Sequence, residues 1–580
     1  MKVKLMKYLK PYAVFVVLAP LLMMLEVFMD LQQPALMATV VNDGILGGSV
    51  SVIVSSCLKM IGAAIIGMIG GFGCTVFAML ASMNYGADLR SALFEKVESF
   101  SFCEIDKFST GSLVTRLTND VTQLQNLVGM ALRMFVRSPL LCMGGIVMAL
   151  SISVKYGIIL AICIPIIFAM VFLVYKKTSP AYLAMQTKLD KLNAILQENL
   201  AGVRVIKAFV RKDHEKERFD NANEDLTKTS LYAMNIMAVV NPAMMIIMNA
   251  VVIAVIYIGG YQVEAAQMRV GDIMAAISYM TQILMNFMMM SMVFTSVPRA
   301  KASADRIGEV LKTEPSIKDG NAKDVVKKGA ITFDHVSFAY PESSGEAVLK
   351  NISLEINAGD HVGLLGSTGA GKSSLVNLIP RFYDATSGRV LIDGIDVRDY
   401  SLSALRSQVG FVLQESVLFS GSIKENIQWG NPEADDEKIA GAALAAQADE
   451  YISAMPEGYN SMLGQRGLTL SGGQKQRACI ARALLKDSKI LIMDDSTSAL
   501  DLGTESRLNA AINSSYSDRT RITIAQRIAS VMNADKIYVI DDGAIAASGT
   551  HDELLSNSDI YRDIYESQMG TMGTGELANG

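Results

Sequence analysis

The stretch Gly366-Ser367-Thr368-Gly369-Ala370-Gly371-Lys372-Ser373 decides the fold of the second half of the chain. It fits the pattern GxxxxGK[ST], in which glycines let backbone N–H groups approach phosphates, the lysine reaches the β- and γ-phosphates, and the hydroxyl binds Mg²⁺. The apolar run 361–365 precedes it as a strand, and the run 374–379, which begins at Ser374, follows it as a helix. This strand–loop–helix context predicts a phosphate-binding loop, because a helix N-terminus favours anions.

A second buried strand is predicted at 490–493, four apolar residues that end in Asp494 and Asp495. A short apolar run of this kind is typical of a central parallel strand. Asp494 would leave the carboxyl end of that strand beside the phosphate-binding loop, where it can hold Mg²⁺ directly or through water. The next residue, Asp495, stands where a catalytic base is expected. The second half is therefore predicted to be an α/β nucleotide-binding domain.

The composition excludes several classes of protein. The 580 residues are 51% hydrophobic and 19% charged, below the roughly 25% of charged residues in a typical soluble domain. The net charge of −5 argues against a general nucleic-acid binder, so no nucleic acid is expected as a partner. The six cysteines show neither a disulfide framework nor CxxC spacing, so no structural zinc site is predicted.

Apolar residues concentrate in the first half of the chain. A bilayer core about 30 Å thick requires roughly 20 apolar residues in each helix. Six spans meet this requirement approximately, at 12–41, 52–81, 138–154, 156–175, 234–259 and 273–297. Four lysines within the first ten residues place the N-terminus in the cytoplasm. Six crossings return the chain to the cytoplasm, so the nucleotide-binding half is expected there.

The connections between spans are of unequal length. Segments 82–137 and 176–233 are long, charged and helix-periodic, whereas the connections on the other side of the membrane are short. Long helices are therefore expected to continue from the membrane into the cytoplasm and return.

Two features of the membrane half leave alternatives open. Glu26 and Asp30 lie on one face of the first helix, where they could face a cavity and contact substrate or a cation, or simply lie near the outer interface. The methionines of 285–292 could line an adaptable apolar cavity or pack ordinarily.

Between the two nucleotide motifs lies Leu470-Ser471-Gly472-Gly473-Gln474. With the phosphate-binding loop, it makes the chain resemble ATP-binding cassette (ABC) transporters, whose signature is LSGGQ. The resemblance covers essentially the whole chain and implies a half-transporter. Its fold would be an all-α six-helix transmembrane domain of the type IV exporter kind, followed by an α/β P-loop nucleotide-binding domain. The implied boundaries are 1–315 for the membrane domain, 316–329 for a linker, 330–568 for the nucleotide-binding domain and 569–580 for a flexible tail.

The resemblance also implies which residues bind ATP and Mg²⁺. Tyr340 occupies the adenine-stacking position, Gln414 lies in a loop that senses Mg²⁺, and Asp501 belongs to the D-loop 498–501. The implied ATP-binding set is Tyr340, Gly366, Ser367, Thr368, Gly369, Ala370, Gly371, Lys372, Ser373, Ser374 and Gln414. The implied metal ligands are Ser373, Gln414 and Asp494.

Two further segments resemble the intracellular coupling segments of exporters, at 108–121 and 198–207. In the family, two nucleotide-binding domains dimerise head to tail, so that 470–474 contacts ATP bound by the partner. Backbone N–H groups of 471–473 open a helix and can hold a γ-phosphate in this way. One chain alone cannot complete a site.

Three positions depart from the family pattern. The residue after the Mg²⁺ aspartate is usually Glu, and here it is Asp495. The switch histidine is replaced by Gln526, and the segment before the signature has Gln465 in place of Glu. Asp495 is one methylene shorter than Glu, and a displacement of about 1 Å can cost roughly 10²-fold in rate. Gln526 carries no positive charge and relays no proton.

These departures resemble the degenerate-site subunit of bacterial heterodimeric multidrug exporters. The chain would bind ATP at its own loop and hydrolyse it poorly, while its intact signature completes the partner's site. The expected function is ATPase-coupled export of a hydrophobic or amphipathic compound, lipid, drug or peptide across a bacterial plasma membrane. A homodimeric exporter, an importer built on the exporter fold, a soluble P-loop ATPase and a regulatory membrane subunit that only binds ATP are the alternatives.

Overall fold

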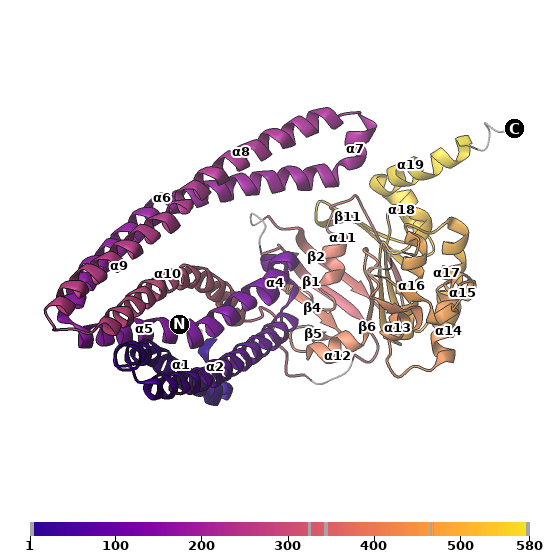
Figure 1. Cartoon of the computed structure of the whole chain (residues 1–580). Helices are drawn as coiled ribbons and strands as arrows, with labels where there is room; N and C mark the ends of the chain where they lie inside the picture. Colours follow the sequence, from indigo (N-terminus) through magenta and orange to yellow (C-terminus); the bar gives the residue numbers. More distant parts are fainter. Residues whose placement is uncertain (1–4, 323–325, 342–345, 465–466, 468, 576–580) are drawn as a thin grey trace. The chain divides into compact units, whose positions relative to one another are not determined.

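The computed structural model describes residues 5–322, 326–341, 346–464, 467 and 469–575, without the side chains at 288, 291–295 and 569–575. The chain divides into two compact units. The first, Met1–Lys96 with Leu113–Lys312, contains helices joined by short turns in its described part. The second, Val97–Ser112 with Thr313–Gly580, contains every strand of the described chain (Figure 1).

Long helices follow one another through the first half of the chain. They form because runs of some 20 apolar residues must satisfy their backbone groups internally once they leave water. In chain order, the long helices and the short helical segments between them are η1 (Leu5–Tyr12), α1 (Ala13–Thr39), η2 (Val40–Ile45), α2 (Val50–Glu98), α3 (Phe102–Phe108), α4 (Thr110–Thr115), η3 (Arg116–Asp120), α5 (Val121–Ile152), α6 (Val154–Ala201), α7 (Val203–Ala208), α8 (Lys212–Ala238), α9 (Val240–Glu264) and α10 (Val270–Lys312).

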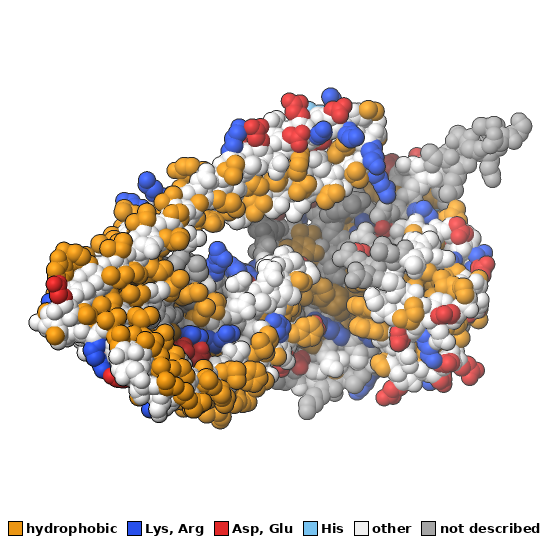
Figure 2. Space-filling model, in the orientation of Figure 1, with side chains coloured by type: hydrophobic (Ala, Val, Ile, Leu, Met, Phe, Trp, Pro, Cys, Tyr) orange, Lys and Arg blue, Asp and Glu red, His pale blue; other side chains and the backbone are white. Residues whose placement is uncertain are grey.

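Five helical segments of the described chain are long and apolar enough to cross a membrane: Leu5–Ile45, Val50–Glu98, Thr110–Ile152, Val154–Ala201 and Lys212–Glu264. They contain four of the first five predicted spans in full and 138–152 of the third, so these five spans are confirmed with a shift of two residues at one end. Figure 2 shows hydrophobic side chains along α6 and α9, whereas charged side chains gather towards the end of α8 that lies near α7. The sixth predicted span falls within α10, where several side chains lie outside the described part, so the count of six stays a prediction.

The helices are longer than a bilayer requires. At 1.5 Å per residue, the 49 residues of α2 reach roughly 70 Å, more than twice the bilayer core. The 48 residues of α6 are comparable, and the short helix α7 joins α6 to α8. The prediction of helices longer than a membrane span is therefore confirmed, and their continuation into the cytoplasm stays a prediction.

The described residues of the second unit form three sheets. The largest has the strand order β12-β11-β3-β10-β9-β6, in which β11, β3, β10, β9 and β6 are parallel and β12 is an antiparallel edge strand. An antiparallel sheet has the order β2-β1-β4-β5, and β7 pairs with β8. The bounds are β1 (Ile331–Phe338), β2 (Leu349–Ile356), β3 (His361–Leu365), β4 (Ser387–Ile392), β5 (Ile395–Asp396), β6 (Val409–Val412), β7 (Gly421–Ser422), β8 (Met462–Leu463), β9 (Ile490–Asp494), β10 (Thr520–Ile524), β11 (Lys536–Asp541) and β12 (Ala544–Gly549).

Three apolar clusters of described residues hold this unit together, one of them between α18, α19 and the segment after β10. Another lies between the sheets and α11, and the third among the helices around α16. The helices are α11 (Lys372–Asn377), α12 (Leu402–Ser407), α13 (Ile423–Gln428), α14 (Asp436–Ala445), α15 (Asp449–Ser453), α16 (Gly472–Leu485), α17 (Leu502–Ser515), α18 (His551–Asn557) and α19 (Asp559–Gly575), with short 3₁₀ turns η4 (Gly458–Asn460) and η6 (Ile528–Ser530). The tail expected from 569 onward thus begins inside α19, and 576–580 lie outside the described residues.

The parallel register positions the candidate site. β10 lies between β3 and β9, so that Ile524 stands beside both Leu364 and Asp494. Ligands of open α/β sheets bind at the carboxyl ends of parallel strands. The segments that follow β3, β9 and β10 therefore leave the sheet at one common edge.

Candidate functional site

The phosphate-binding loop joins β3 to α11, as predicted. Three glycines of this loop adopt positive φ, and Gly369 does so at +88°. Gly371 is the residue before α11 and has φ +98°, and Gly366 has φ +155°, both unfavourable for residues with a side chain. A Cβ at Gly366 would also lie 2.1 Å from the Ile540 carbonyl oxygen. The backbone of 366–373 can therefore approach a phosphate closely.

Lys372 lies folded over this loop. Its Nζ donates to the carbonyl oxygens of Gly366 at 2.9 Å and Ser367 at 2.8 Å, and its side chain is buried. Burial lowers the pKa of Lys372, although Asp495 and Asp494 act in the opposite direction. A phosphate would give this ammonium a stronger, charge-assisted acceptor than the two carbonyls provide.

Ser373 and Asp494 form the oxygen pair expected for Mg²⁺. The Ser373 hydroxyl donates to Asp494 Oδ1 at 3.0 Å, and burial raises the pKa of Asp494. Mg²⁺ in phosphate-transfer sites is usually held by one or two protein oxygens together with water and phosphate oxygens. These two side chains fit that requirement, because they lie next to the loop that would hold the phosphates.

Asp495 and Gln526 are in direct contact. Gln526 Nε2 donates to Asp495 Oδ2 at 2.8 Å, and Asp495 itself adopts φ +47°. Burial raises the pKa of Asp495, while hydrogen bonds from Gln526 and Gln414 favour its ionised form. The structure thus brings together two of the three positions that depart from the family pattern, and adds Gln414 from the loop after β6. The third position, Gln465, lies outside the described residues.

Tyr340 connects the phosphate-binding loop to an aromatic cluster. Its hydroxyl lies 2.9 Å from the Ser374 hydroxyl, and its ring packs edge-on against Phe338 and Tyr383, with centroids at 4.8 and 5.2 Å. The position is compatible with stacking on a base beside the loop. Tyr340 and Ser374, which the sequence predicted separately as ATP-binding residues, are therefore neighbours.

The same cluster reaches α3, which belongs to the second unit. Tyr383 donates from its hydroxyl to Asp106 Oδ2 at 2.7 Å, and the Phe102 and Phe382 rings lie 4.6 Å apart. Burial, followed by the Asp106 carboxylate, raises the pKa of Tyr383. Neither Asp106 nor Tyr383 was identified from the sequence. Asp106 lies just before the segment 108–121 that resembles a coupling segment, and this position in the sequence could have identified it.

The predicted signature residues form the start of α16. Ser471 caps this helix: its hydroxyl accepts from Gln474 N–H at 3.4 Å, and Gln474 Oε1 accepts from Ser471 N–H at 2.9 Å. A Cβ at Gly473 would lie 2.9 Å from the Ala499 carbonyl oxygen, so glycine permits close approach there. Leu470 is buried, and Gly472 opens the helix.

The signature helix is joined to the predicted D-loop. Gln476 Oε1 accepts from Ala499 N–H at 3.1 Å, and Asp501 caps α17 by accepting from Thr504 N–H at 2.9 Å. None of the described residues of 470–474 hydrogen-bonds to 366–374. The signature and the phosphate-binding loop are thus each formed, but no bond in the described part of the chain connects them.

Glu26 and Asp30 are paired with a cation that the sequence reading missed. Arg137 of α5 binds Glu26 Oε1 at 2.5 Å and Asp30 Oδ2 at 3.0 Å. A Cβ at Gly71 of α2 would lie 2.6 Å from Glu26 Oε2, so this glycine makes room for the carboxylate. A role in substrate binding stays a prediction. Of the methionines of α10, Met285 and Met289 are half exposed, and those at 288 and 292 lie outside the described side chains.

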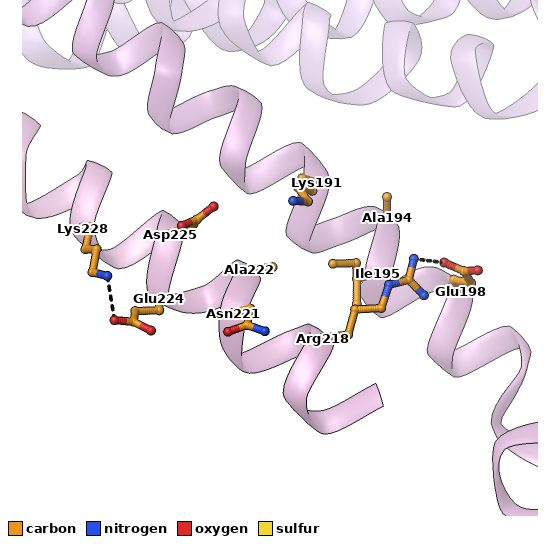
Figure 3. A pocket seen from close by; sticks show the side chains of 10 residues that line it. All are labelled: Lys191, Ala194, Ile195, Glu198, Arg218, Asn221, Ala222, Glu224, Asp225 and Lys228. Atoms are coloured by element: carbon orange, nitrogen blue, oxygen red, sulfur yellow. Dashed lines mark hydrogen bonds and ion pairs between the residues drawn. The ribbon is translucent and has the colours of Figure 1, made fainter. Parts of the chain in front are cut away.

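A wide hollow lies between α6 and α8, with a volume of about 660 Å³ (Figure 3). Its charged side chains are largely paired: Arg218 binds Glu198 at 2.7 Å, and Lys228 binds Glu224 at 2.7 Å. Because its charges already compensate one another, we assign it no ligand.

Comparison with known proteins identifies both halves. Residues 16–287 match the family model of the ABC transporter transmembrane region, and residues 349–498 match the family model described as ABC transporter. The ABC transporter ATP-binding protein YfiB of Bacillus subtilis is 42% identical over 571 residues, 98% of this chain and 99% of its own length. The ATP-dependent lipid A-core flippase of Syntrophus aciditrophicus is 32% identical over 510 residues, 87% of this chain and 84% of its own length.

Among solved structures, a bacterial Atm1-family ABC exporter with ATP bound superposes with a TM-score of 0.79 at 26% identity, covering 96% of this chain and 99% of that one. The helical half, the P-loop half and their order in the chain all agree with these relatives. The chain therefore belongs to the ABC transporter family, as an exporter-type half-transporter whose transmembrane region is followed by one ATP-binding domain.

Proposed function

We propose that the chain is the degenerate-site half of a heterodimeric ABC exporter. Its own phosphate-binding loop binds MgATP and supports only slow hydrolysis, and its signature 470–474 completes the productive site of a different partner chain. The complex would export an amphipathic compound across a bacterial plasma membrane, with the nucleotide-binding domain in the cytoplasm.

The observation that carries the proposal is the bond between Gln526 and Asp495. A general base must reach the attacking water, and Asp495 is shorter than Glu by one methylene. The Gln526 amide donates one of its two N–H groups to this carboxylate, and it carries no charge with which to hold a γ-phosphate. Both substitutions thus weaken the same step, and they do so in contact with each other.

Binding of ATP is supported independently of hydrolysis. The loop 366–373 has its glycine conformations, Lys372 lies on it, and Ser373 stands beside Asp494. All of these groups act on ground-state phosphates or Mg²⁺ and need no catalytic base.

The need for a second chain is supported by the surface around α7. Val205, Phe209 and Val210 at this end of the α6–α8 pair are 60%, 73% and 85% exposed. Exposed apolar side chains of this kind are typical of an interaction surface. The segment also resembles the second coupling segment of exporters. A homodimer would use the same surface, so it remains the alternative that the experiment must separate.

The experiment is purification of a tagged chain from its native membrane, followed by identification of the copurified ABC subunit and by measurement of MgATP binding. The proposal expects one different subunit at equal amounts, with Glu after its Mg²⁺ aspartate. Lys372→Ala should weaken ATP binding at this chain's site about 10–100-fold, because a charge-assisted bond is lost. Recovery of this chain only, with full ATPase activity, would favour the homodimer instead.

A further inference from the structure

One face of the C-terminal helix α19 packs against the segment that carries Gln526. Tyr561, Ile564 and Tyr565 join an apolar cluster with Ala525 and Ile528. The spacing of three, then one, places these side chains on one side of the helix, and Tyr561 is fully buried. The helix is thus built against the switch segment 525–531.

Gln568 continues the same face, three residues after Tyr565. Its Nε2 donates to the Gln526 carbonyl oxygen at 2.8 Å, and its Oε1 accepts from Ile528 N–H at 2.9 Å. Ile528 opens the 3₁₀ turn η6, where the first N–H groups lack partners within the turn. One side-chain amide therefore holds the backbone on both sides of Arg527.

Gln526 is consequently held both at its backbone and at its side chain. Its backbone carbonyl accepts from Gln568, and its side chain donates to Asp495 at 2.8 Å. The place of the Gln526 amide beside the phosphate-binding loop depends on both bonds. Misplacement of a group by about 1 Å is enough to alter phosphate chemistry strongly.

We infer that Gln568 is a positioning residue, through which α19 sets the place of Gln526 and thereby how firmly ATP is retained at this chain's own site. The inference rests on the proposed ATP site. It assigns to the C-terminal helix a part in the nucleotide cycle that packing alone would not give it.

Three single variants separate positioning from packing. Gln568→Leu removes both hydrogen bonds and keeps the bulk of the side chain. Ile564→Ala loosens the packing of α19 without touching the amide. Glu566→Gln, an exposed change on the same turn, serves as the matched control.

The measurement is the dissociation rate of a fluorescent MgATP analogue from the purified complex, with thermal unfolding recorded for each variant. The kinetic phase that belongs to this chain is the one that Lys372→Ala removes. We expect Gln568→Leu to accelerate that phase roughly tenfold, the scale of losing hydrogen bonds of ordinary net strength. Ile564→Ala should lower the unfolding temperature and leave the phase within about twofold, and Glu566→Gln should change neither.

A double-mutant cycle between Gln568 and Gln526 distinguishes a positioning role from a purely structural one. In a Gln526→Ala background no side-chain amide remains to be placed, so Gln568→Leu should no longer accelerate dissociation. A full tenfold effect in that background would overturn the inference, as would equal acceleration by Ile564→Ala, or none by Gln568→Leu. If Lys372→Ala removes no phase at all, the proposed ATP site itself fails.

Discussion

The Gln526 amide donates to the Asp495 carboxylate, so two side chains share one place beside the phosphate-binding loop. Both positions follow strands of the same parallel sheet, since Ile524 pairs in register with Asp494. A longer carboxylate would reach further towards the γ-phosphate, and an imidazole could donate to that phosphate in place of the amide. Substitution of both residues therefore tests directly what this pair contributes to hydrolysis.

We expect Asp495→Glu combined with Gln526→His to convert the site proposed to be weak towards a competent one. Glu restores the reach to the attacking water, and His restores a group that holds water and γ-phosphate in line. Neither change alone should suffice, because the two defects belong to one transition state. The measurement is residual ATPase activity of the complex after the partner's own catalytic base has been inactivated.

The single variants are the controls for this repair. Absence of any rise with the double variant would contradict the assignment of Asp495 as the limiting group, provided that the partner's signature reads LSGGQ. Sequencing the partner checks that condition.

Asp393 is a carboxylate that stabilises the folded nucleotide-binding domain. Its two oxygens accept from four consecutive backbone N–H groups, those of Lys327, Lys328, Gly329 and Ala330, at 2.8–2.9 Å. Burial would raise the pKa of Asp393, but these four hydrogen bonds outweigh it and lower the pKa. The carboxylate thus fixes the entry to β1 in its ionised form.

Asp393→Asn should destabilise the nucleotide-binding domain by about 2 kcal/mol, because an amide N–H₂ would face N–H donors. Asn tolerates the φ of +50° at this position, so backbone strain is not added. The contribution of a carboxylate with a lowered pKa is fully present above the ordinary Asp value near 3.9 and is lost as pH falls through the folded value. The difference between the two proteins should therefore shrink below about pH 4.

Denaturant unfolding followed by Trp429 fluorescence measures this effect, since Trp429 is the chain's one tryptophan and belongs to the second unit. Asp542→Asn is the matched control: Asp542 also has positive φ, but it is exposed and forms a surface ion pair with Lys350. That change should cost under about 0.5 kcal/mol. Equal loss from both variants would contradict the account of Asp393.

Single residues were predictable where the signal is local. The phosphate-binding loop and the Asp494–Asp495 pair stand in contiguous motifs, and the structure places them at one sheet edge. Gln568 and Arg137 were not found, because their partners lie 42 and at least 107 positions away in the chain. Bonds of that separation depend on packing between elements, which local patterns do not encode.

At the scale of elements, α3 is attached to the rest of the second unit by an aromatic cluster and by Glu104, whose carboxylate accepts from Ser316 N–H at 3.1 Å. Tyr340 next to the phosphate-binding loop packs on Tyr383, and Tyr383 donates to Asp106 of α3. The residues bonded are 277 positions apart. The cluster offers a path by which the state of the nucleotide site can influence the helix.

Tyr383→Phe should loosen α3 while leaving ATP binding within about twofold. The phenyl ring keeps its contacts, and only the bond to the Asp106 carboxylate is lost, roughly a tenfold change in local opening. Hydrogen exchange of the backbone of 102–108 in the full chain measures it.

Tyr459→Phe is the matched control, since Tyr459 also donates to a carboxylate, Asp449, at 2.6 Å among helices remote in sequence from α3. It should leave exchange in 102–108 unchanged. Equal exchange in the parent chain and in Tyr383→Phe would show that the hydroxyl does not hold α3.

Elements were predictable where composition alone determines them. Apolar length identified five spans, and the charged helical periodicity of 82–137 and 176–233 identified their continuation as helices. The attachment of α3 to Tyr383 could not be predicted, because the residues around Tyr383 carry no pattern of their own. The sixth span depends on side chains outside the described part of α10.

At the scale of the whole molecule, the chain contributes to two ATP sites, with its phosphate-binding loop to one and with its signature 470–474 to the other. The proposal gives these two contributions different roles. Beside the phosphate-binding loop, Asp495 stands where the family usually has Glu, and it accepts a hydrogen bond from the Gln526 amide. In the signature, Ser471 caps α16 and Gly473 lies close to Ala499. In the proposed heterodimer the first site retains ATP, and the second serves the partner's hydrolysis. The two halves of this one chain should consequently differ in their sensitivity to mutation.

ATPase activity of the complete complex tests this asymmetry most directly, with Gly473→Glu in the signature compared with Asp495→Asn in the chain's own site. The account predicts that Gly473→Glu abolishes turnover, because a side chain there collides with Ala499 and fills the place of the partner's γ-phosphate. Asp495→Asn should retain most of the activity. Loss of turnover in Asp495→Asn with activity retained in Gly473→Glu would contradict the account and assign hydrolysis to this chain's own site.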